Sequence, residues 1–523
     1  MATVTIAQGT LKGGQAITDS GFQYFEFMGI PYAKPPVGEL RFKSPQTAEP
    51  WQGIRDATAT DPSTIACQVS FLTGEATGSE DCLYLNVNTP QLPVSGLKLK
   101  PVMVYIHGGG FIFGNGILKQ ENGVDYLIEN DVVIVTINYR LGPLGFINLG
   151  ILEAAGNMGL KDQVKALQWV ENNIHIFGGD KDNVTIVGVS AGAASCEYLL
   201  LSPLAKGIFH KSILCSGSSF NDWAYSSLES ARTKAVNLAK ELGYTGTDDN
   251  MDAVHKILCE APAHKITATS FNVTSASKTD YFVFVPSIER DFEDGDAFLT
   301  ESPYTLLKEG RYNQVPVIRG FCNKEGSLAN AMKPFAVKEF IEKKVFTNYI
   351  NYNLNDDDVE KYDSDFSAAY TNNGDARDEA TDFFGDNLFV AGICLAGKLL
   401  CKTVPVYMYK FCYDGKLNMY KALYGVKMAG AAHGDDAGYL LRIAALTARI
   451  LDDNDILTRN RLTKMFTNFA KTGNPNSTDL PVQWPAYTEE SKKYLNIDTE
   501  VTIQTDYEPK KMAIFESLYE KYA

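Results

Sequence analysis

Short apolar runs alternate with helical periodicity along the chain, and this pattern predicts a sheet covered by helices. Six runs rich in Val, Ile and aromatic residues have the composition of strands buried on both faces of a mostly parallel sheet. They occupy residues 101–110, 131–140, 183–192, 211–218, 314–321 and 404–411. Between the second and third runs, residues 159–178 carry apolar side chains at helical spacing, which predicts a strand-helix-strand crossover. The alternation as a whole predicts an α/β fold with helices on both faces of a central sheet.

The N-terminal residues follow a different pattern. Segments 3–13 and 21–30 alternate apolar and polar positions around Gly-rich turns, so we expect an antiparallel hairpin at the edge of the sheet. Further helices are predicted over 230–242, 378–400, 458–471 and 510–522. No internal repeat, Pro/Ser/Gly linker or charge run marks a seam, and we therefore predict a single domain over residues 1–523.

Composition and charge narrow the class of protein. The 523 residues are 45% hydrophobic and 21% charged, which is typical of a folded soluble protein. The formal net charge of -15 would repel phosphate backbones and anionic lipid, so nucleic acid and membrane surfaces are not expected as partners. The oligomeric state is left open by these properties.

The compartment is judged from targeting signals. No run of 18 or more consecutive apolar residues stands out as a membrane span, and the start MATVTIAQGTLKGGQ lacks a basic segment followed by an apolar one. These features favour a cytoplasmic protein. A trimmed, mature secreted chain would look the same.

Cysteine usage argues against a metal centre or a disulfide scaffold. Nine cysteines are spread over the chain without a C-x-x-C motif or a Cys/His cluster, so we expect no metal and no cofactor. Seven of them are expected to be buried small hydrophobic residues. Cys67 and Cys82 differ because they bracket a polar loop short enough to be bridged, and the residues alone leave open whether they form a disulfide.

A candidate nucleophile lies at the end of the third apolar run. Gly188-Val189-Ser190-Ala191-Gly192 follows a predicted strand and precedes a predicted helix. A G-x-S-x-G segment in this context is a nucleophile elbow, a turn so sharp that the serine hydroxyl is exposed on a strained backbone. A side chain at either glycine would collide with a neighbouring element. We therefore predict that Ser190 is a catalytic nucleophile.

A serine nucleophile needs a base and an acid that orients the base. In this kind of fold the chain order is Ser, then Asp or Glu, then His. Glu325 follows the fifth apolar run, and residues just past the carboxyl ends of strands face the active site of an open α/β sheet. With Glu325 as the acid, His433 is the only histidine left in order, and it stands in the Gly/Ala-flanked loop AGAAHGDDAG.

The first apolar run ends in a glycine loop. His107, Gly108, Gly109 and Gly110 follow the predicted strand directly. Such a loop supplies backbone N–H donors to a developing oxyanion, together with the N–H of the residue after the nucleophile, here Ala191. A nucleotide cradle is the weaker interpretation, since neither G-K-[ST] nor G-x-G-x-x-G is present.

With these motifs in view, the chain resembles the carboxylesterase/cholinesterase family, the type-B carboxylesterases, along nearly its whole length. The matching blocks are FMGIPYAKPPVGELRFKSP, SEDCLYLNVNTP, VYIHGGGF, INYRLGPLGF, GNMGLKDQVKALQWV, GVSAGAAS and GFCNKEG. Within the family it looks most like the insect α-esterases, which are detoxifying carboxylesterases. The resemblance implies an α/β-hydrolase fold.

The resemblance also implies roles for individual residues. It implies Ser190, Glu325 and His433 as the catalytic triad. It implies Gly109, Gly110 and Ala191 as the oxyanion donors, and a disulfide between Cys67 and Cys82. Small-molecule esters are the expected substrates, and organophosphate-type inhibitors are expected to modify Ser190.

Two departures from the family pattern bear on specificity. The loop from Cys67 to Cys82 has no Trp, whereas cholinesterases carry their cation-binding indole there, and Val189 stands where many relatives have Glu. Both favour neutral or apolar esters and a detoxifying carboxylesterase. The alternatives are a dedicated hormone or pheromone esterase and a slow-turnover protein of the same fold that sequesters its ligand.

Overall fold

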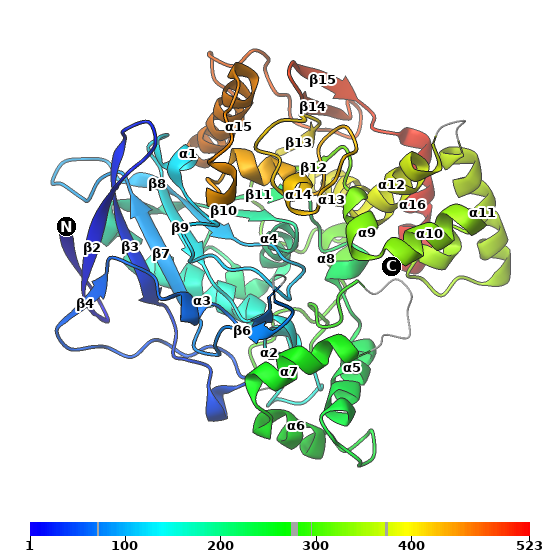
Figure 1. Cartoon of the computed structure of the whole chain (residues 1–523), viewed down its shortest axis with the longest axis horizontal. Helices are drawn as coiled ribbons and strands as arrows, with labels where there is room; N and C mark the ends of the chain where they lie inside the picture. The colour runs from blue at the N-terminus through cyan, green and yellow to red at the C-terminus, as the bar shows by residue number, and fades with distance from the viewer. Residues whose placement is uncertain (71–72, 274–280, 294, 372–374) are drawn as a thin grey trace.

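A computed structural model describes residues 1–70, 73–273, 281–293, 295–371 and 375–523 of the chain. A long twisted sheet runs through the molecule, with helices packed around it (Figure 1). The order of neighbouring strands in this sheet is β1-β2-β3-β7-β9-β8-β10-β11-β12-β13-β14-β15, and β4 pairs with β2.

The centre of the sheet is parallel, as the apolar runs predict. Its strands, each parallel to its neighbours within the group, are β9 (Val133–Ile137), β8 (Lys100–Ile106), β10 (Gly179–Val189), β11 (Lys211–Cys215), β12 (Val317–Cys322) and β13 (Val406–Phe411). Beyond β13 lie β14 (Lys493–Ile497), which is parallel to it, and the antiparallel edge strand β15 (Val501–Thr505). The parallel order brings the carboxyl ends of the central strands to one edge of the sheet.

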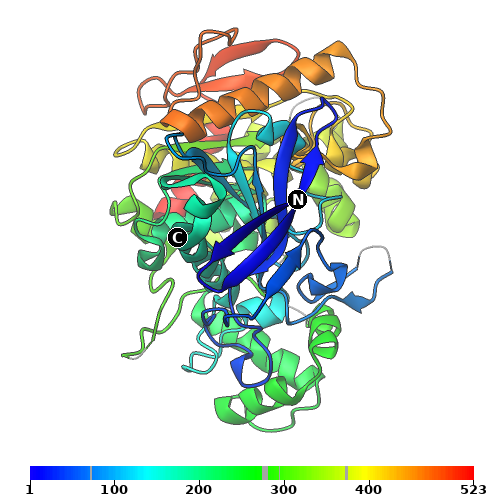
Figure 2. The same ribbon diagram turned by 90° about the vertical axis from the view of Figure 1, so that its left-hand side faces the viewer.

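The N-terminal edge is antiparallel, and the predicted hairpin is confirmed. The strands there are β1 (Ala2–Ile6), β2 (Gly9–Ile17), β3 (Gln23–Pro31) and β7 (Tyr84–Thr89), with β4 (Ile54–Ala57) parallel to β2. Figure 2 shows β2 and β3 in blue at the front of the turned view. A separate two-stranded sheet consists of β5 (Gln68–Val69) and β6 (Ala76–Thr77).

Each face of the sheet has its own apolar core, because successive side chains of a strand point to opposite faces. On β8, Val102, Val104 and Ile106 belong to one core, and Met103 and Tyr105 belong to the other. The first core is covered by α3 (Met158–Asn173), α4 (Ala191–Leu201) and α13 (Ala391–Leu400), the second by α1 (Asp125–Ile128) and α15 (Asp453–Thr472). The expected helices on both faces are therefore present.

The remaining helices lie around this core and form much of the lower and right-hand parts of Figure 1. They are α2 (Gly142–Phe146), α5 (Leu228–Glu241), α6 (Met251–Glu260), α7 (Ala263–Thr269), α8 (Pro303–Lys308), α9 (Ser327–Met332), α10 (Pro334–Lys343), α11 (Asp356–Tyr370), α12 (Ala376–Gly385), α14 (Met419–Leu423) and α16 (Pro509–Tyr522). The helices predicted over 230–242, 458–471 and 510–522 correspond to α5, α15 and α16.

The helix predicted over 378–400 is continuous but not uniform. Helices α12 and α13 are joined by η8 (Asp386–Val390), a π-helical turn. The combined helix Ala376–Leu400 passes a length and composition test for a membrane span, although 83% of its most apolar window is buried inside the protein. A mostly buried helix passes that test as readily as a spanning one, so the result is weak evidence for a span.

Candidate active site

Ser190 stands between strand β10 and helix α4 in a strained conformation. Its φ of 58° and ψ of -122° lie outside the regions that L-residues favour. The predicted reason for the flanking glycines is confirmed: a Cβ on Gly188 would lie 2.1 Å from the carbonyl oxygen of Gly192, and one on Gly192 would lie 2.1 Å from that of Ile106. The elbow therefore holds Ser190 at the carboxyl end of β10.

Ser190, His433 and Glu325 form one chain of hydrogen bonds. The Nε2 atom of His433 lies 2.8 Å from Ser190 Oγ, and its Nδ1 atom lies 2.6 Å from Glu325 Oε2. All three side chains are buried, with Ser190 the most exposed of them at 8%. The structure thus brings together the three residues that the elbow motif, the position past a strand and the chain order had each indicated from far-apart positions.

Main-chain bonds fix the two loops that carry the acid and the histidine. Lys324 and Ala432 form an isolated parallel bridge, so the residues next to Glu325 and His433 are paired through the backbone. The other carboxylate oxygen of Glu325, Oε1, accepts a bond from the backbone N–H of Cys322 at 2.7 Å. With both oxygens occupied, the Glu325 carboxylate cannot rotate away from the imidazole.

The glycine loop lies beside the nucleophile. It follows β8, the parallel neighbour of β10, and a Cβ on Gly108 would lie only 3.1 Å from Ser190 Cβ. Gly109 and Gly110 come next in this loop, and Ala191 begins α4 directly after Ser190. The three residues predicted as oxyanion donors are therefore all in segments adjacent to the Ser190 side chain.

An aromatic wall, defined as Phe389, Trp223 and Phe282, was not found from the sequence. Phe389 and His433 have ring centroids 4.3 Å apart, and Trp223 lies 5.6 Å from Phe389 and 6.0 Å from Phe282. Phe282 covers the glycine loop, since a Cβ on Gly110 would lie 2.4 Å from its Cζ atom. The wall therefore runs from the histidine to the glycine loop.

Two further carboxyl groups lie just after His433. Asp435 Oδ2 accepts the backbone N–H of Ala432 at 2.7 Å, and Asp436 Oδ2 accepts the hydroxyl of Tyr409 at 2.6 Å. Burial raises the pKa of each of these carboxyls to about 6. The negative charge of Glu325 raises the pKa of Asp436 further. This side of the site therefore holds several carboxyl groups with little access to solvent.

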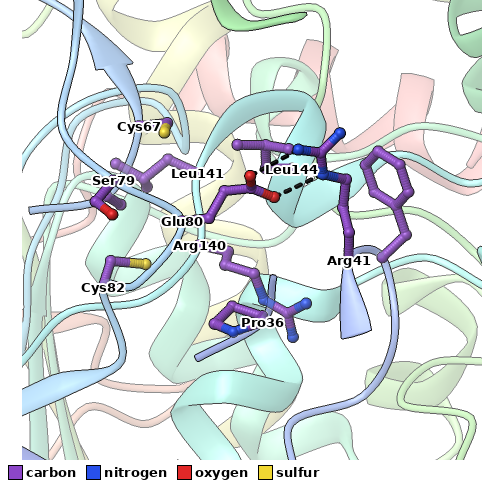
Figure 3. Close-up of a pocket in the computed structure, with 11 residues that line it drawn as sticks. Pro36, Arg41, Cys67, Ser79, Glu80, Cys82, Arg140, Leu141 and Leu144 are labelled. Atoms are coloured by element: carbon purple, nitrogen blue, oxygen red, sulfur yellow. Dashed lines mark hydrogen bonds and ion pairs between the residues drawn. The ribbon is translucent and has the colours of Figure 1, made fainter. Parts of the chain in front are cut away.

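The predicted disulfide between Cys67 and Cys82 is not formed, and both are free, buried thiols (Figure 3). They line one small pocket that also contains the ion pair of Arg41 with Glu80, in which Nε and Oε1 are 2.6 Å apart. This ion pair and the bonds from Arg41 to three carbonyls of the 258–261 segment hold the loop without a bridge. Burial raises the pKa of Cys67 to about 12 and that of Cys82 well above its usual value, so both stay protonated, whereas the thiolate is the form that oxidises.

Across the described residues, no group of three or more His, Cys, Asp or Glu side chains is arranged to hold a metal ion. The chemistry that the geometry offers is instead that of a hydroxyl polarised by an imidazole, next to a glycine-rich loop. Such an arrangement suits acyl transfer.

Comparison with known proteins gives the same class. A profile of the "Carboxylesterase family" matches residues 1–515. Juvenile hormone esterase of Tribolium castaneum is 35% identical over 504 residues, with 90% of this chain and 83% of the relative covered. Esterase FE4 of Myzus persicae is 34% identical over 511 residues, with 92% and 86% covered.

A solved structure extends the likeness to three dimensions. Juvenile hormone esterase from Manduca sexta, with OTFP covalently attached, superposes with a TM-score of 0.88 at 30% identity and 99% coverage of both chains. The fold is thus the α/β-hydrolase fold, and the protein is a carboxylic-ester hydrolase. It belongs to the carboxylesterase family, as the sequence blocks predicted.

Proposed function

We propose that the enzyme hydrolyses esters through an acyl-enzyme intermediate on Ser190. The Ser190 oxygen attacks the ester carbonyl carbon while His433 Nε2 takes the hydroxyl proton. As the carbon-oxygen bond to the alcohol breaks, His433 gives that proton to the leaving oxygen. Water then attacks the acyl-enzyme with His433 again as base, and the acid is released as the proton returns to Ser190.

The remaining residues stabilise charge during these steps. Glu325 holds His433 in the tautomer with Nδ1 protonated and offsets the positive charge that develops on the imidazole. The N–H groups of Gly109, Gly110 and Ala191 donate to the carbonyl oxygen as it becomes negative. The observation that carries the proposal is the chain of bonds from Ser190 Oγ to His433 at 2.8 Å and from His433 to Glu325 at 2.6 Å.

The substrates we propose are neutral or apolar esters, including the xenobiotic esters that a detoxifying carboxylesterase removes. The support is the aromatic wall, in which Phe389, Trp223 and Phe282 have no charged atom and are each nine-tenths or more buried. The one polar group, the indole N–H of Trp223, donates to the carbonyl oxygen of Leu388 at 2.8 Å and so is already satisfied. An apolar acyl group gains free energy when it leaves water and contacts such side chains.

Labelling with a fluorophosphonate tests the nucleophile. We expect one adduct, on Ser190, because a serine beside a base and oxyanion donors reacts readily with phosphorus electrophiles, as organophosphate-type inhibitors do. Ser190→Ala should abolish labelling and lower kcat by at least about a thousandfold, and Glu325→Gln, which keeps the shape but loses the charge, should also lower it by at least about a hundredfold. An adduct mapped to another residue would refute the assignment.

A dedicated hormone esterase is the second candidate, and the likeness to two juvenile hormone esterases favours it. The two candidates differ in breadth. A panel of juvenile hormone, aryl esters and pyrethroid esters should give kcat/KM values within about tenfold of each other for a broad enzyme, and a preference above about a hundredfold for a dedicated one. A burst of product followed by slow turnover would instead identify a protein that sequesters its ligand.

A further inference from the structure

We propose that His107 is a positioning residue for ester hydrolysis, because its Nδ1–H group holds the carbonyl of Gly108 and so aims the N–H of Gly109 at the oxyanion. This inference rests on the proposed function, in which Gly109 is an oxyanion donor. The imidazole Nδ1 atom of His107 lies 2.8 Å from the Gly108 carbonyl oxygen. A carbonyl only accepts, so His107 carries its proton on Nδ1.

Peptide geometry links the two groups. The peptide bond between Gly108 and Gly109 is planar and trans, since the described residues contain no cis peptide bond. In a trans peptide the carbonyl and the following N–H point in opposite directions. Anchoring the Gly108 carbonyl oxygen on the His107 ring therefore fixes the direction of the Gly109 N–H, which lies in the same peptide plane and points the opposite way.

The other two proposed donors are fixed in the same way, but by the backbone. The carbonyl of Gly109, which precedes the Gly110 N–H, accepts from the N–H groups of Ile112 and Phe113 at 3.0 and 3.1 Å. The carbonyl of Ser190, which precedes the Ala191 N–H, accepts the N–H of Ala194 at 3.0 Å within α4. Of these three carbonyls, that of Gly108 is the one held by a side chain. A side-chain substitution can therefore remove its hydrogen bond.

His107 is itself held rigidly. Its ring stacks on Tyr139 with centroids 4.4 Å apart and planes 19° from parallel, and the Tyr139 hydroxyl donates to the His107 carbonyl at 2.9 Å. The His107 side chain is buried, and burial lowers its pKa to about 4. The ring is therefore neutral at working pH, with a single N–H, and that N–H is committed to Gly108.

Two substitutions separate the hydrogen bond from the packing. His107→Phe keeps an aromatic ring for stacking on Tyr139 but has no donor. His107→Asn loses most of the ring but places its amide NH₂ near the position of Nδ1, where it can donate to Gly108. We expect His107→Phe to lower kcat about 10- to 100-fold with KM within about threefold of the parent, and His107→Asn to recover at least about half of the loss on a logarithmic scale.

The affinity for a trifluoromethyl ketone provides the deciding measurement. The ketone adds to Ser190 to form a tetrahedral oxyanion, so its inhibition constant should rise in His107→Phe by the same factor as kcat falls. An ether of similar shape has no carbonyl for Ser190 to attack and therefore forms no oxyanion. It should bind the parent and the variants equally. Melting temperatures show whether the variants are folded.

The inference is overturned if His107→Phe retains the parental kcat and ketone affinity. It is also overturned if ether binding weakens as much as ketone binding, because the loss would then not depend on the oxyanion. The same holds if His107→Asn is no better than His107→Phe, because the hydrogen-bond donor would then not account for the loss. Ser190→Ala distinguishes this failure from failure of the proposed function: if it is inactive while His107→Phe is unaffected, the nucleophile stands and only the role of His107 falls.

Discussion

The phenyl ring of Phe389 lies against the imidazole of His433, with ring centroids 4.3 Å apart and planes inclined by 34°. Phe389 belongs to η8, the π-helical turn between α12 and α13. Such turns interrupt α-helices with one extra residue and often occur at functional sites. The backbone of η8 is also held by a residue outside the helix, since Asn221 Nδ2 donates to the Phe389 carbonyl oxygen at 3.0 Å. The turn therefore places a fixed ring beside the proposed base.

Replacing that ring should free the imidazole. We expect Phe389→Ala to lower kcat about tenfold, because His433 gains alternative orientations, and to lower the free energy of unfolding by about 3 to 5 kcal/mol. Phe389→Leu, which fills most of the space, is the matched control and should retain most of both. Steady-state kinetics and urea unfolding measure the two effects. Full activity in Phe389→Ala would show that the ring does not confine the base.

The free thiols lead to a second prediction. All nine cysteines are free, so alkylation in denaturant without a reductant should add nine groups to the intact protein by mass spectrometry. In the native state Cys67 and Cys82 should react slowly, because both are buried and their raised pKa values keep them protonated. A mass corresponding to seven groups, with Cys67 and Cys82 unmodified, would show that these two cysteines form the disulfide that the family resemblance implies.

Local sequence patterns were sufficient for much of the site. The elbow around Ser190 and the glycine loop each lie in one contiguous segment, and each follows a strand that its Val and Ile content makes evident. Glu325 was indicated by its place just past a strand, and His433 required the order rule, because its Gly/Ala-flanked loop is not a specific motif. The parallel sheet then places all of these segments at one edge, which periodicity predicts without any coordinates.

The aromatic wall could not be predicted in this way. Trp223, Phe282 and Phe389 come from three separate segments without a shared spacing, and only their packing in the folded chain brings the rings together. The same is true of the ion pair of Arg41 with Glu80, which holds the Cys67 loop without a disulfide. Contacts of this kind depend on tertiary geometry, whereas motifs depend on the neighbouring residues. The single-domain prediction over 1–523 remains a prediction.

The buried carboxyl of Asp386 predicts a dependence of stability on pH. Burial raises its pKa to about 7, although the Lys511 charge and the bond from the Tyr370 hydroxyl at 2.6 Å both favour the ionised form. The folded state therefore binds a proton that the unfolded state releases near its ordinary pKa of 3.8. The contribution of Asp386 to stability should therefore fall as pH rises from about 4 to about 7 and change no further above that.

Asp386→Asn removes this titration and keeps an oxygen that can accept the Tyr370 hydroxyl. We expect the variant to match the parent at about pH 4 and to exceed it by roughly 2 to 4 kcal/mol at about pH 8. Urea unfolding at the two pH values measures the difference. If Asp386→Asn were instead less stable than the parent at pH 8, the Asp386 carboxyl would have to be ionised in the folded protein, and its charge would have to stabilise the fold.

Val189 leads to the last prediction, which concerns charge in the substrate. Its side chain lines a cavity of about 10 Å³ within the second core, together with Tyr105 and Ala437, and the walls of this cavity are apolar. The family resemblance implies Glu at this position in many relatives, and the loop from Cys67 to Cys82 of this chain has no Trp. A quaternary ammonium therefore lacks the indole contact that a Trp in this loop would provide, worth about 0.5 to 2 kcal/mol, and Val189 adds no negative charge.

We accordingly expect the enzyme to gain nothing from positive charge on the alcohol. The comparison is kcat/KM for butyrylcholine against 3,3-dimethylbutyl butyrate, which has the same shape without the charge, and the neutral ester should be hydrolysed at least as efficiently. Val189→Glu should not create a choline esterase, because its carboxylate would enter the apolar cavity and cost several kcal/mol of stability, about 3 or more. Val189→Met, of similar length but uncharged, should be tolerated better. A clear preference of the unmutated enzyme for butyrylcholine would mean that other residues build a cation site, and the assignment to neutral esters would then be wrong.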